Sequence, residues 1–248
     1  MPRVDRRFEA ELKFGDTLNI PWLHSMGDAT SGASTADITL YDTVQNTTQL
    51  IVNYWYYKAV GVDDRNAAQS RPDYLANALR KLSYSIAAMM DTKVNTLFGF
   101  TNTVGTEASA LTDDVLIAAK EYLDLANAPF TDRSLILDPE SVTDLMKIDK
   151  FVRDDYVNKG AVVQPGGLVG RSLYGAEVYQ TTNLLINNTT YHNAAMLHRE
   201  AILFIGEYGP KVERFRWPEK MTDVVNVQAL FGCVLARNNH GVLIKTRS

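Results

Sequence analysis

The longest regular pattern of hydrophobic and polar positions runs over residues 70–99. Its apolar residues recur at a mean spacing of about 3.7, close to the period of ~3.6 of an α-helix. Ser70 and Asp73 have the form of a capping box, and Gly99 stands where a left-handed C-cap residue would lie. Such a helix would be about 40 Å long at ~1.5 Å per residue, which suggests a scaffold element. Its apolar stripe consists of Leu75, Leu79, Leu82, Ile86, Met90, Val94 and Leu97.

Two stretches closer to the N-terminus show patterns that are typical of β-strands. Residues 7–22 alternate between apolar and polar side chains, with an interruption at Gly15 and Asp16. Residues 49–62 are rich in β-branched and aromatic side chains. We expect the two stretches to pair as a long antiparallel ribbon, with the polar segment 23–48 as its tip.

This ribbon needs something to lie on, because a two-stranded sheet is marginally stable in water by itself. A neighbouring subunit would supply such a surface. The candidates for contacts between subunits are Leu18, Ile20, Trp22, Tyr54, Trp55 and Tyr56.

The rest of the chain mixes helices and strands. Thr112 can cap a helix over residues 112–127, and Pro129 would prevent its continuation. Asp138 and Pro139 have the form of a cap and first residue of another helix. The order of ribbon, long helix and mixed elements indicates the α+β class. Strands are expected over 134–137, 176–181, 224–235 and 241–246, a strand or a helix over 194–206, and polar connections over 63–69 and 100–110.

Composition and charge narrow the classes of protein. The 248 residues carry a formal net charge of -4, with no basic run of the kind that nucleic-acid readers and membrane-surface proteins use. Cys233 is the only cysteine, which excludes an intramolecular disulfide and a cysteine-rich metal site. The N-terminus has no apolar signal region, and no apolar run approaches the ~20 residues of a membrane span. We therefore expect an intracellular protein without a membrane partner.

Candidate chemistry is sparse. His198 is followed by Arg199 and Glu200, so a proton-transfer role is conceivable, although a structural, hydrogen-bonded histidine fits the same residues. Cys233 lies in an apolar strand pattern, where a thiol is normally inert. The glycines of residues 166–170 lack the pattern of a phosphate-binding loop. None of the known metal-binding spacings occurs among the four histidines His24, His192, His198 and His240. The sequence therefore predicts no catalytic residue, no metal site and no cofactor.

Several segments are distinctive by their order along the chain. They are residues 4–21 with the core GDTLNI, the hydrophobic strand 49–60, the long helix 70–99, the HREA of residues 198–201, and the closing strands at 230–235 and 242–244. Together they resemble the major capsid proteins of tailed bacteriophages, which have the Hong Kong 97 capsid fold. The family carries an N-terminal arm ahead of the segment that matches Val4, and almost nothing precedes it here.

The resemblance implies a structural protein that is not an enzyme. Copies of the chain would form hexamers and pentamers of an icosahedral shell around double-stranded DNA, in a virion assembled in the bacterial cytoplasm. Portal, scaffolding or decoration proteins would be further partners. The implied parts are an E-loop ribbon of residues 1–22 and 49–62 with 23–48 as its tip, a peripheral domain of 63–110 and 194–229 with 70–99 as its spine helix, and an axial domain of 111–193 and 230–248.

Two alternatives remain open. The same fold could form an encapsulin-like cellular compartment, and particles holding a cargo protein without a genome would identify it. A soluble α+β enzyme with a site built from His198, Asp154 and Glu200 would instead be a small, discrete species in solution.

Overall fold

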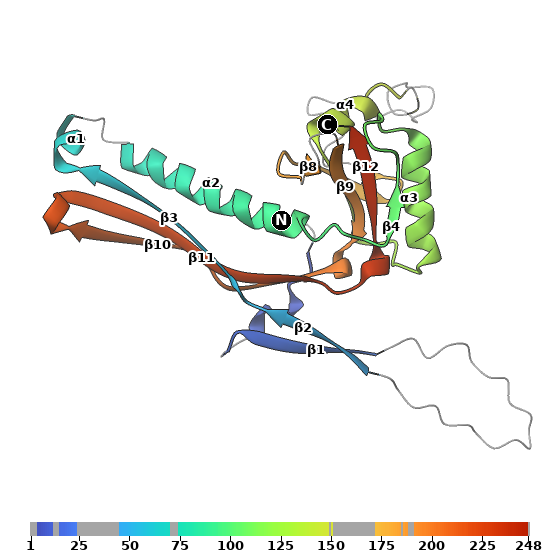
Figure 1. The fold of residues 1–248 in the computed structure, drawn as a ribbon, viewed down its shortest axis with the longest axis horizontal. Coiled ribbons are helices and arrows are strands. Elements are labelled where there is room, and N and C mark those ends of the chain that lie inside the picture. Colours follow the sequence, from blue (N-terminus) through green and yellow to red (C-terminus); the bar gives the residue numbers. More distant parts are fainter. Residues whose placement is uncertain are drawn as a thin grey trace, which may run out of the picture.

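The structure, a computed structural model, describes residues 4–11, 15–23, 45–69, 74–148, 150, 172–184, 186–187 and 191–247. It has three parts, which we call the body, the arm and the ribbon (Figure 1). The body holds a seven-stranded sheet, the arm a three-stranded sheet with one long helix, and the ribbon two strands near the root of the arm. Among the described residues, no helix has the length and apolar character that crossing a membrane requires.

The body is built on a mixed sheet of short strands in the order β4-β12-β9-β5-β7-β6, with β8 paired to β9. All five residues of β5 are buried, so both faces of the sheet are covered at its centre. The strands are β4 (Asn102–Val104), β5 (Arg133–Leu137), β6 (Ser172–Leu173), β7 (Ala176–Gln180), β8 (Ile186–Asn187), β9 (Tyr191–His198) and β12 (Gly241–Arg247).

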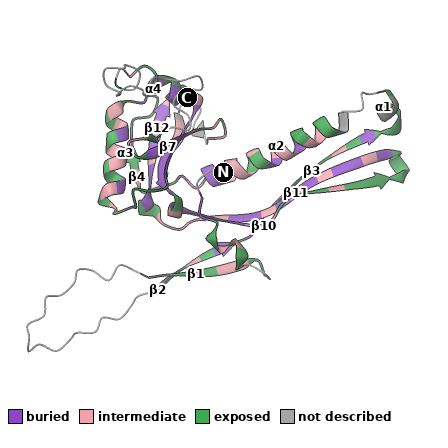
Figure 2. Cartoon of the chain, turned by 180° about the vertical axis from the view of Figure 1, so that it is seen from behind, coloured by how far each residue is buried: buried purple, intermediate pink, exposed green. Residues whose placement is uncertain are grey.

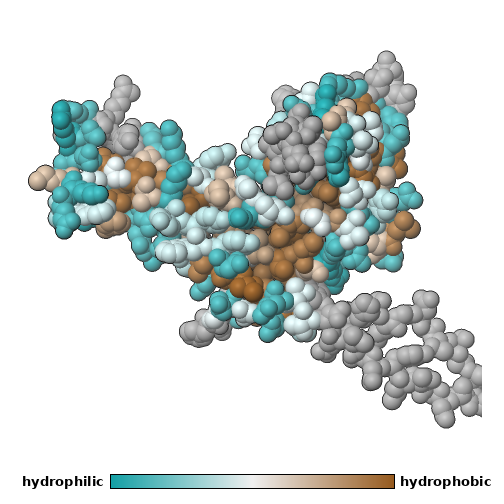
Figure 3. Space-filling view, in the orientation of Figure 1, coloured by the Kyte–Doolittle hydropathy of each residue, from teal (hydrophilic) through white to brown (hydrophobic). Residues whose placement is uncertain are grey.

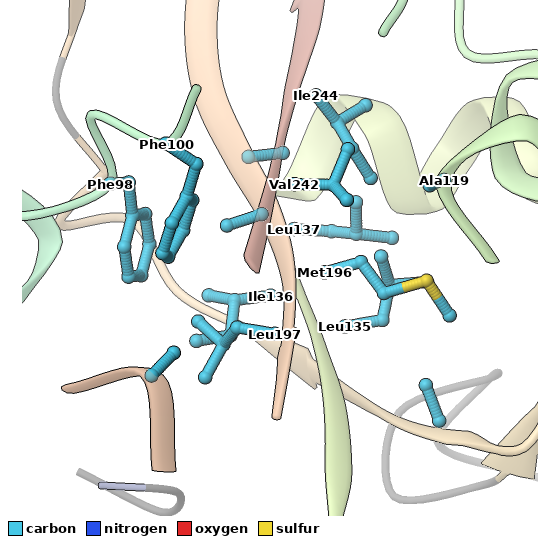
Figure 4. Close-up of a cluster of buried hydrophobic side chains, with 14 of the residues drawn as sticks. Phe98, Phe100, Ala119, Leu135, Ile136, Leu137, Met196, Leu197, Val242 and Ile244 are labelled. Atoms are coloured by element: carbon cyan, nitrogen blue, oxygen red, sulfur yellow. The ribbon is translucent and has the colours of Figure 1, made fainter. Parts of the chain in front are cut away.

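Side chains from different elements cover the two faces of this sheet. In Figure 4, Leu135 and Met196 point to the side of Ala119, which belongs to α3 (Asp113–Leu125). Ile136 points to the other side, toward Phe98, which follows the long helix. The body thus has a core on both sides of its sheet.

Local sequence signals determine the ends of the helices in the body. The carboxylate of Asp138 accepts hydrogen bonds from the backbone N–H groups of Glu140 (3.0 Å) and Ser141 (3.2 Å). This cap and Pro139 begin α4 (Pro139–Leu145), as the sequence predicts. Thr112 lies at the N-cap of α3, also as predicted, although its side chain makes no capping hydrogen bond.

A buried carboxylate ties α4 to the last strand. Asp144 accepts hydrogen bonds from Lys147 Nζ (3.0 Å) and from Arg247 Nε at the end of β12 (2.9 Å). Burial alone would raise the pKa of Asp144, but the hydrogen bonds from these two cations outweigh burial and hold the pKa below its ordinary value. The ionised form of Asp144 therefore stabilises the body.

The arm consists of α2 (Tyr74–Asn95) packed on the antiparallel sheet β10-β11-β3. The strands are β3 (Tyr54–Asp63), β10 (Ile202–Trp217) and β11 (Thr222–Leu235), and α1 (Asp64–Gln69) lies at the outer end. Leu82 and Ile86 of α2 pack on Val225 and Val227 of β11. Burial declines along β10 from the body toward the outer end of the arm (Figure 2).

The predicted long helix is present, but its ends differ from the prediction. The segment 70–73, including the predicted cap at Ser70 and Asp73, lies outside the described residues. The helix ends at Asn95, and Gly99 does not adopt the predicted left-handed conformation. Short-range bonds replace that cap, because the hydroxyl of Thr96 donates to the carbonyl of Lys93 (2.6 Å) and Leu97 N donates to Val94 (3.0 Å).

The prediction of one strand from residue 7 onward is wrong. Residues Arg7–Ala10 form a 3₁₀ helix, and the strand β1 (Thr17–Leu23) begins later. Local charge pairs favour the turn, because Asp5 accepts from the backbone and the guanidinium of Arg7, and Arg6 pairs with Glu9. These contacts link neighbours along the chain and compete with an extended strand.

The predicted pairing of residues 7–22 with 49–62 is only partly correct. β1 pairs with β2 (Gln45–Ile51), so residues 45–48 belong to a strand and not to the tip, whereas residues 54–63 pair with β11 in the arm. The chain changes sheets at Val52, where it crosses β11 so closely that a Cβ on Gly232 would lie 2.3 Å from the carbonyl oxygen of Ile51. Only glycine permits this approach.

Two other segments differ from the prediction, and a third, for which the sequence allowed a strand or a helix, is now assigned. Residues 64–69 form helix α1, and the predicted loop 100–110 contains β4, which pairs in parallel with β12. The ambiguous stretch 194–206 consists of the end of β9, a short 3₁₀ helix and the start of β10. β4 and β9 therefore join the seven-stranded sheet, while the end of β11 stays in the arm sheet. The division into peripheral and axial domains stays a prediction.

Candidate assembly surfaces and a histidine cluster

The arm sheet has one covered face and one open face. On β3, Tyr54 and Tyr56 point toward the covered side and pack on Phe231, with ring centroids 5.5 and 5.8 Å away. Trp55 and Tyr57 point to the opposite side, because neighbouring residues of a strand alternate between faces. Their side chains are 58% and 66% exposed, with ring centroids 5.6 Å apart.

β10 adds two more aromatic residues to the same side. Tyr57 pairs with Gln228, and Phe215 pairs with Val224, which lies four residues from Gln228 along β11. Since directly paired and second-neighbour residues share a face, Phe215 and Trp217 lie on the side of Tyr57. Phe215 is 48% exposed and Trp217 is 41% exposed. We call the surface formed by Trp55, Tyr57, Phe215 and Trp217 the open face.

The ribbon packs on the root of the arm within the same chain. Ile20 of β1 and Leu50 of β2 are buried against Leu203 and Ile205 of β10. Figure 3 shows apolar residues gathered where the arm, the body and the ribbon meet. The surface that the sequence analysis sought in a neighbouring subunit is therefore supplied, for this end of the ribbon, by the chain itself.

The six predicted contact residues are thus in different environments. Leu18 and Ile20 contact the chain's own cluster at the arm root, and Tyr54 and Tyr56 pack on the cluster that extends from the core of the body to Phe231. Trp55 is exposed on the open face, and the side chain of Trp22 lies outside the described part. A role for any of them between subunits stays a prediction. Phe215 and Trp217 could not be predicted from the sequence, because only the register of β10 against β11 places them on the same face as Trp55 and Tyr57 of β3.

A second feature is a cluster of two histidines and a glutamate where the arm meets the body. His198 ends β9, Glu200 lies in the 3₁₀ helix Arg199–Ala201, and His240 lies in the 3₁₀ helix Asn238–His240. One nitrogen or oxygen atom from each residue lies within 4.8 Å of those of the other two. The imidazole rings of His198 and His240 meet edge to face, with centroids 5.8 Å apart.

Burial and charge define the chemistry of this cluster. Burial lowers the pKa of both histidines, and this outweighs the opposing effect of the Glu200 carboxylate. Nearby Arg133 and Arg237 lower the pKa further, so the neutral imidazole is favoured. Glu200 pairs with Arg7 (3.2 Å) and Arg237 (3.1 Å). His240 Nδ1 is buried and has no hydrogen-bond partner among the described residues.

The sequence predicted two of the three residues of this cluster. His198 and Glu200 are indeed together, but Asp154, the third residue of the enzyme hypothesis, lies outside the described residues, as do His24 and the loop 166–170. His240 was missed because it lies 42 positions beyond His198 and approaches it only through the fold. Burial raises the pKa of Cys233 to about 11, so its thiol stays protonated and unreactive near neutral pH.

Comparison with known proteins gives similarity in structure only. No family model matches the sequence, and no curated protein is similar to it in sequence. The fold is similar to a structure from Mycobacterium phage Che8, with a TM-score of 0.79 and 18% identity over 97% of this chain and 88% of that one. It is also similar to the capsid structure of the cyanophage P-SCSP1u, with a TM-score of 0.76 and 13% identity over 99% of this chain and 86% of that one.

A capsid of a native GTA particle is similar too, with a TM-score of 0.68 and 9% identity over 95% of this chain and 86% of that one. Each of these structural matches extends over almost the whole of this chain. The chain therefore has an α+β capsid fold of the kind found in phage capsids. The resemblance inferred from the sequence is confirmed at the level of fold.

Proposed function

We propose that this chain is the major capsid protein of a tailed bacteriophage. Copies of it associate into hexamers and pentamers of an icosahedral shell that encloses double-stranded DNA. The open face of the arm is the observation that supports self-association most directly. It displays four aromatic side chains on an extended element, and exposed apolar patches of this kind are typical of interaction surfaces. The capsid fold makes a second copy of the chain the expected partner.

The shape of the subunit supports this role. The arm extends away from the body, and the strands of the ribbon run in another direction beside the arm root, so we expect each to meet a different neighbour (Figure 1). Each contact between subunits would be modest, and closure of the shell would multiply it over many copies. Portal, scaffolding or decoration proteins would bind the assembled shell, and the packaged DNA would lie within it without sequence-specific contacts.

The test is to purify the particles that the full chain forms in the cells that produce it, and to examine them by electron microscopy. We expect closed shells with nuclease-protected double-stranded DNA of uniform length. Shells that hold a cargo protein and no genome would contradict the phage role and support an encapsulin-like compartment. A stable monomer or dimer in every condition tested would contradict both.

A further inference from the structure

We propose that His198, Glu200 and His240 bind a divalent transition-metal ion, with Zn²⁺ the best match to two imidazoles and one carboxylate. Two imidazoles and a carboxylate are a common Zn²⁺ ligand set that leaves a fourth position for water. The three ligand atoms already lie within 4.8 Å of one another. Tetrahedral Zn²⁺ holds its ligand atoms roughly 3.3 Å apart, so small side-chain rotations would complete the site.

The position of the cluster gives such an ion a structural role. The 3₁₀ helix Arg199–Ala201 connects β9 of the body to β10 of the arm. The 3₁₀ helix Asn238–His240 connects β11 of the arm to β12 of the body. An ion held between them would therefore join two crossings of the chain between the arm and the body, and would limit motion of one against the other. This role is independent of the proposed function.

The unpaired nitrogen of His240 is a second observation that points to a ligand. His240 is 8% exposed, and its Nδ1 is buried without a partner among the described residues. A buried polar atom without a partner costs free energy, which is why such atoms are rare in folded proteins. A metal ion bound to this nitrogen would remove that cost.

The other two ligands have partners that binding must accommodate. His198 Nδ1 accepts a long hydrogen bond of 3.3 Å from the backbone N–H of Glu200. Binding of the ion at Nε2 moves the ring proton from Nε2 to Nδ1, so this weak bond is lost and the proton stays on the ring. Arg7 and Arg237 orient the carboxylate of Glu200 but also compete with the ion for it. We therefore expect weaker binding than at a structural zinc site, and tighter binding when Arg237 loses its charge.

The experiment uses the full chain without a histidine tag, dialysed against a chelator and then titrated with Zn²⁺ by calorimetry and with Co²⁺ by visible absorption. We expect one equivalent of metal to bind to the wild type. The affinity of His198→Gln and of His240→Gln for the metal should be lower by about tenfold or more. His192→Gln is the matched control, because His192 lies on β9 outside the cluster. It should bind the metal as the wild type does.

Circular dichroism identifies variants that fail to fold. If a histidine variant does so, metal binding to Glu200→Gln and Arg237→Gln tests the proposal in its place. We expect Glu200→Gln to weaken Zn²⁺ binding and Arg237→Gln to strengthen it. Zn²⁺ should also raise the thermal unfolding midpoint of the wild type and of His192→Gln, because it binds the folded state. Absence of binding to the wild type at ~1 mM Zn²⁺, where even a site of modest affinity would be occupied, would overturn the proposal. Equal binding to both cluster variants and to the wild type would also overturn it.

Discussion

The body and the arm bury their sheets in different ways. All five residues of β5, at the centre of the body, are buried, whereas β3 of the arm is largely exposed apart from Val62 and its helix-facing positions. The body covers both faces of its sheet with its own chain. The arm covers one face with α2 and leaves aromatic residues on the other. The difference indicates that the body is closed on both faces of its sheet, while the arm presents a face that the described part of the chain leaves uncovered.

The largest effect on stability should come from the centre of the body. Leu137 is fully buried on β5, so Leu137→Ala should lower the free energy of unfolding by about 2–5 kcal/mol, measured by chemical denaturation. Leu125→Ala is the matched control, because Leu125 is 72% exposed on α3 in the same part. A similar loss in both variants would contradict the distinction between core and surface in the body.

A change inside the arm should have a smaller and more local effect. Leu82 is buried between α2 and β11, and we expect Leu82→Ala to lower stability by about 2–3 kcal/mol. Hydrogen exchange should accelerate in α2, β3 and β11 while β5 and β9 remain protected, because the arm can open by itself. Equal acceleration in both parts would show that the arm and the body unfold together.

Removal of a buried charge in the body should affect stability more than removal of an exposed charge in the arm. Asp144→Asn should destabilise the body by about 1–2 kcal/mol at pH 7, because it removes a carboxylate bonded to Lys147 and Arg247. The pKa of Asp144 is lower in the folded than in the unfolded chain, so the unfolded chain binds the proton more readily. The stabilisation is therefore present above about pH 4 and is lost as pH falls further.

Thermal unfolding of the wild type and of Asp144→Asn across this pH range measures the effect. The difference between them should shrink as pH falls below about 4. The matched variant, Asp223→Asn, removes a carboxylate that pairs with Arg214 at the exposed outer end of the arm. It should leave the unfolding midpoint unchanged, because exposed ion pairs contribute little. A difference for Asp144→Asn that stays constant down to pH 2 would contradict its assignment.

Removal of residues 24–44 should have little effect on the folded subunit. A two-residue Asn-Gly turn in their place retains β1 and β2 and the buried contacts of Ile20 and Leu50. We expect an unfolding midpoint like that of the wild type but a loss of shells in light scattering. Normal assembly of the shortened chain would show that the ribbon does not need residues 24–44 to join subunits.

The sequence predicts the locally determined elements well. The cap at Asp138, the start of the helix after Thr112, the apolar period of the long helix and the strands at 134–137, 224–235 and 241–246 all depend on neighbours along the chain. The features that were predicted wrongly depend on residues that are distant along the chain. Tyr54–Asp63 pairs with a strand that lies more than 150 positions later, and the sharp change of sheets at Val52 depends on Gly232. No local pattern carries that information.

The candidate sites show the same limit. The sequence identifies the aromatic residues of β3, and strand alternation separates Trp55 and Tyr57 from Tyr54 and Tyr56, but only the fold shows which pair is covered. It likewise identifies His198 without His240, because these residues meet only where two crossings between the arm and the body come together. Surfaces and clusters formed by several strands need the fold before they can be recognised.

Sedimentation velocity of the full chain and a variant of its open face tests the central claim most directly. The variant Trp55→Ser, Tyr57→Ser, Phe215→Ser replaces three exposed side chains, and Tyr84→Ser is the control because Tyr84 is 71% exposed on α2, away from the open face. We expect the wild type and the control to sediment as large closed particles, and the open-face variant to remain a small, folded species. Particles of equal size and yield from all three would contradict the claim that the open face joins subunits.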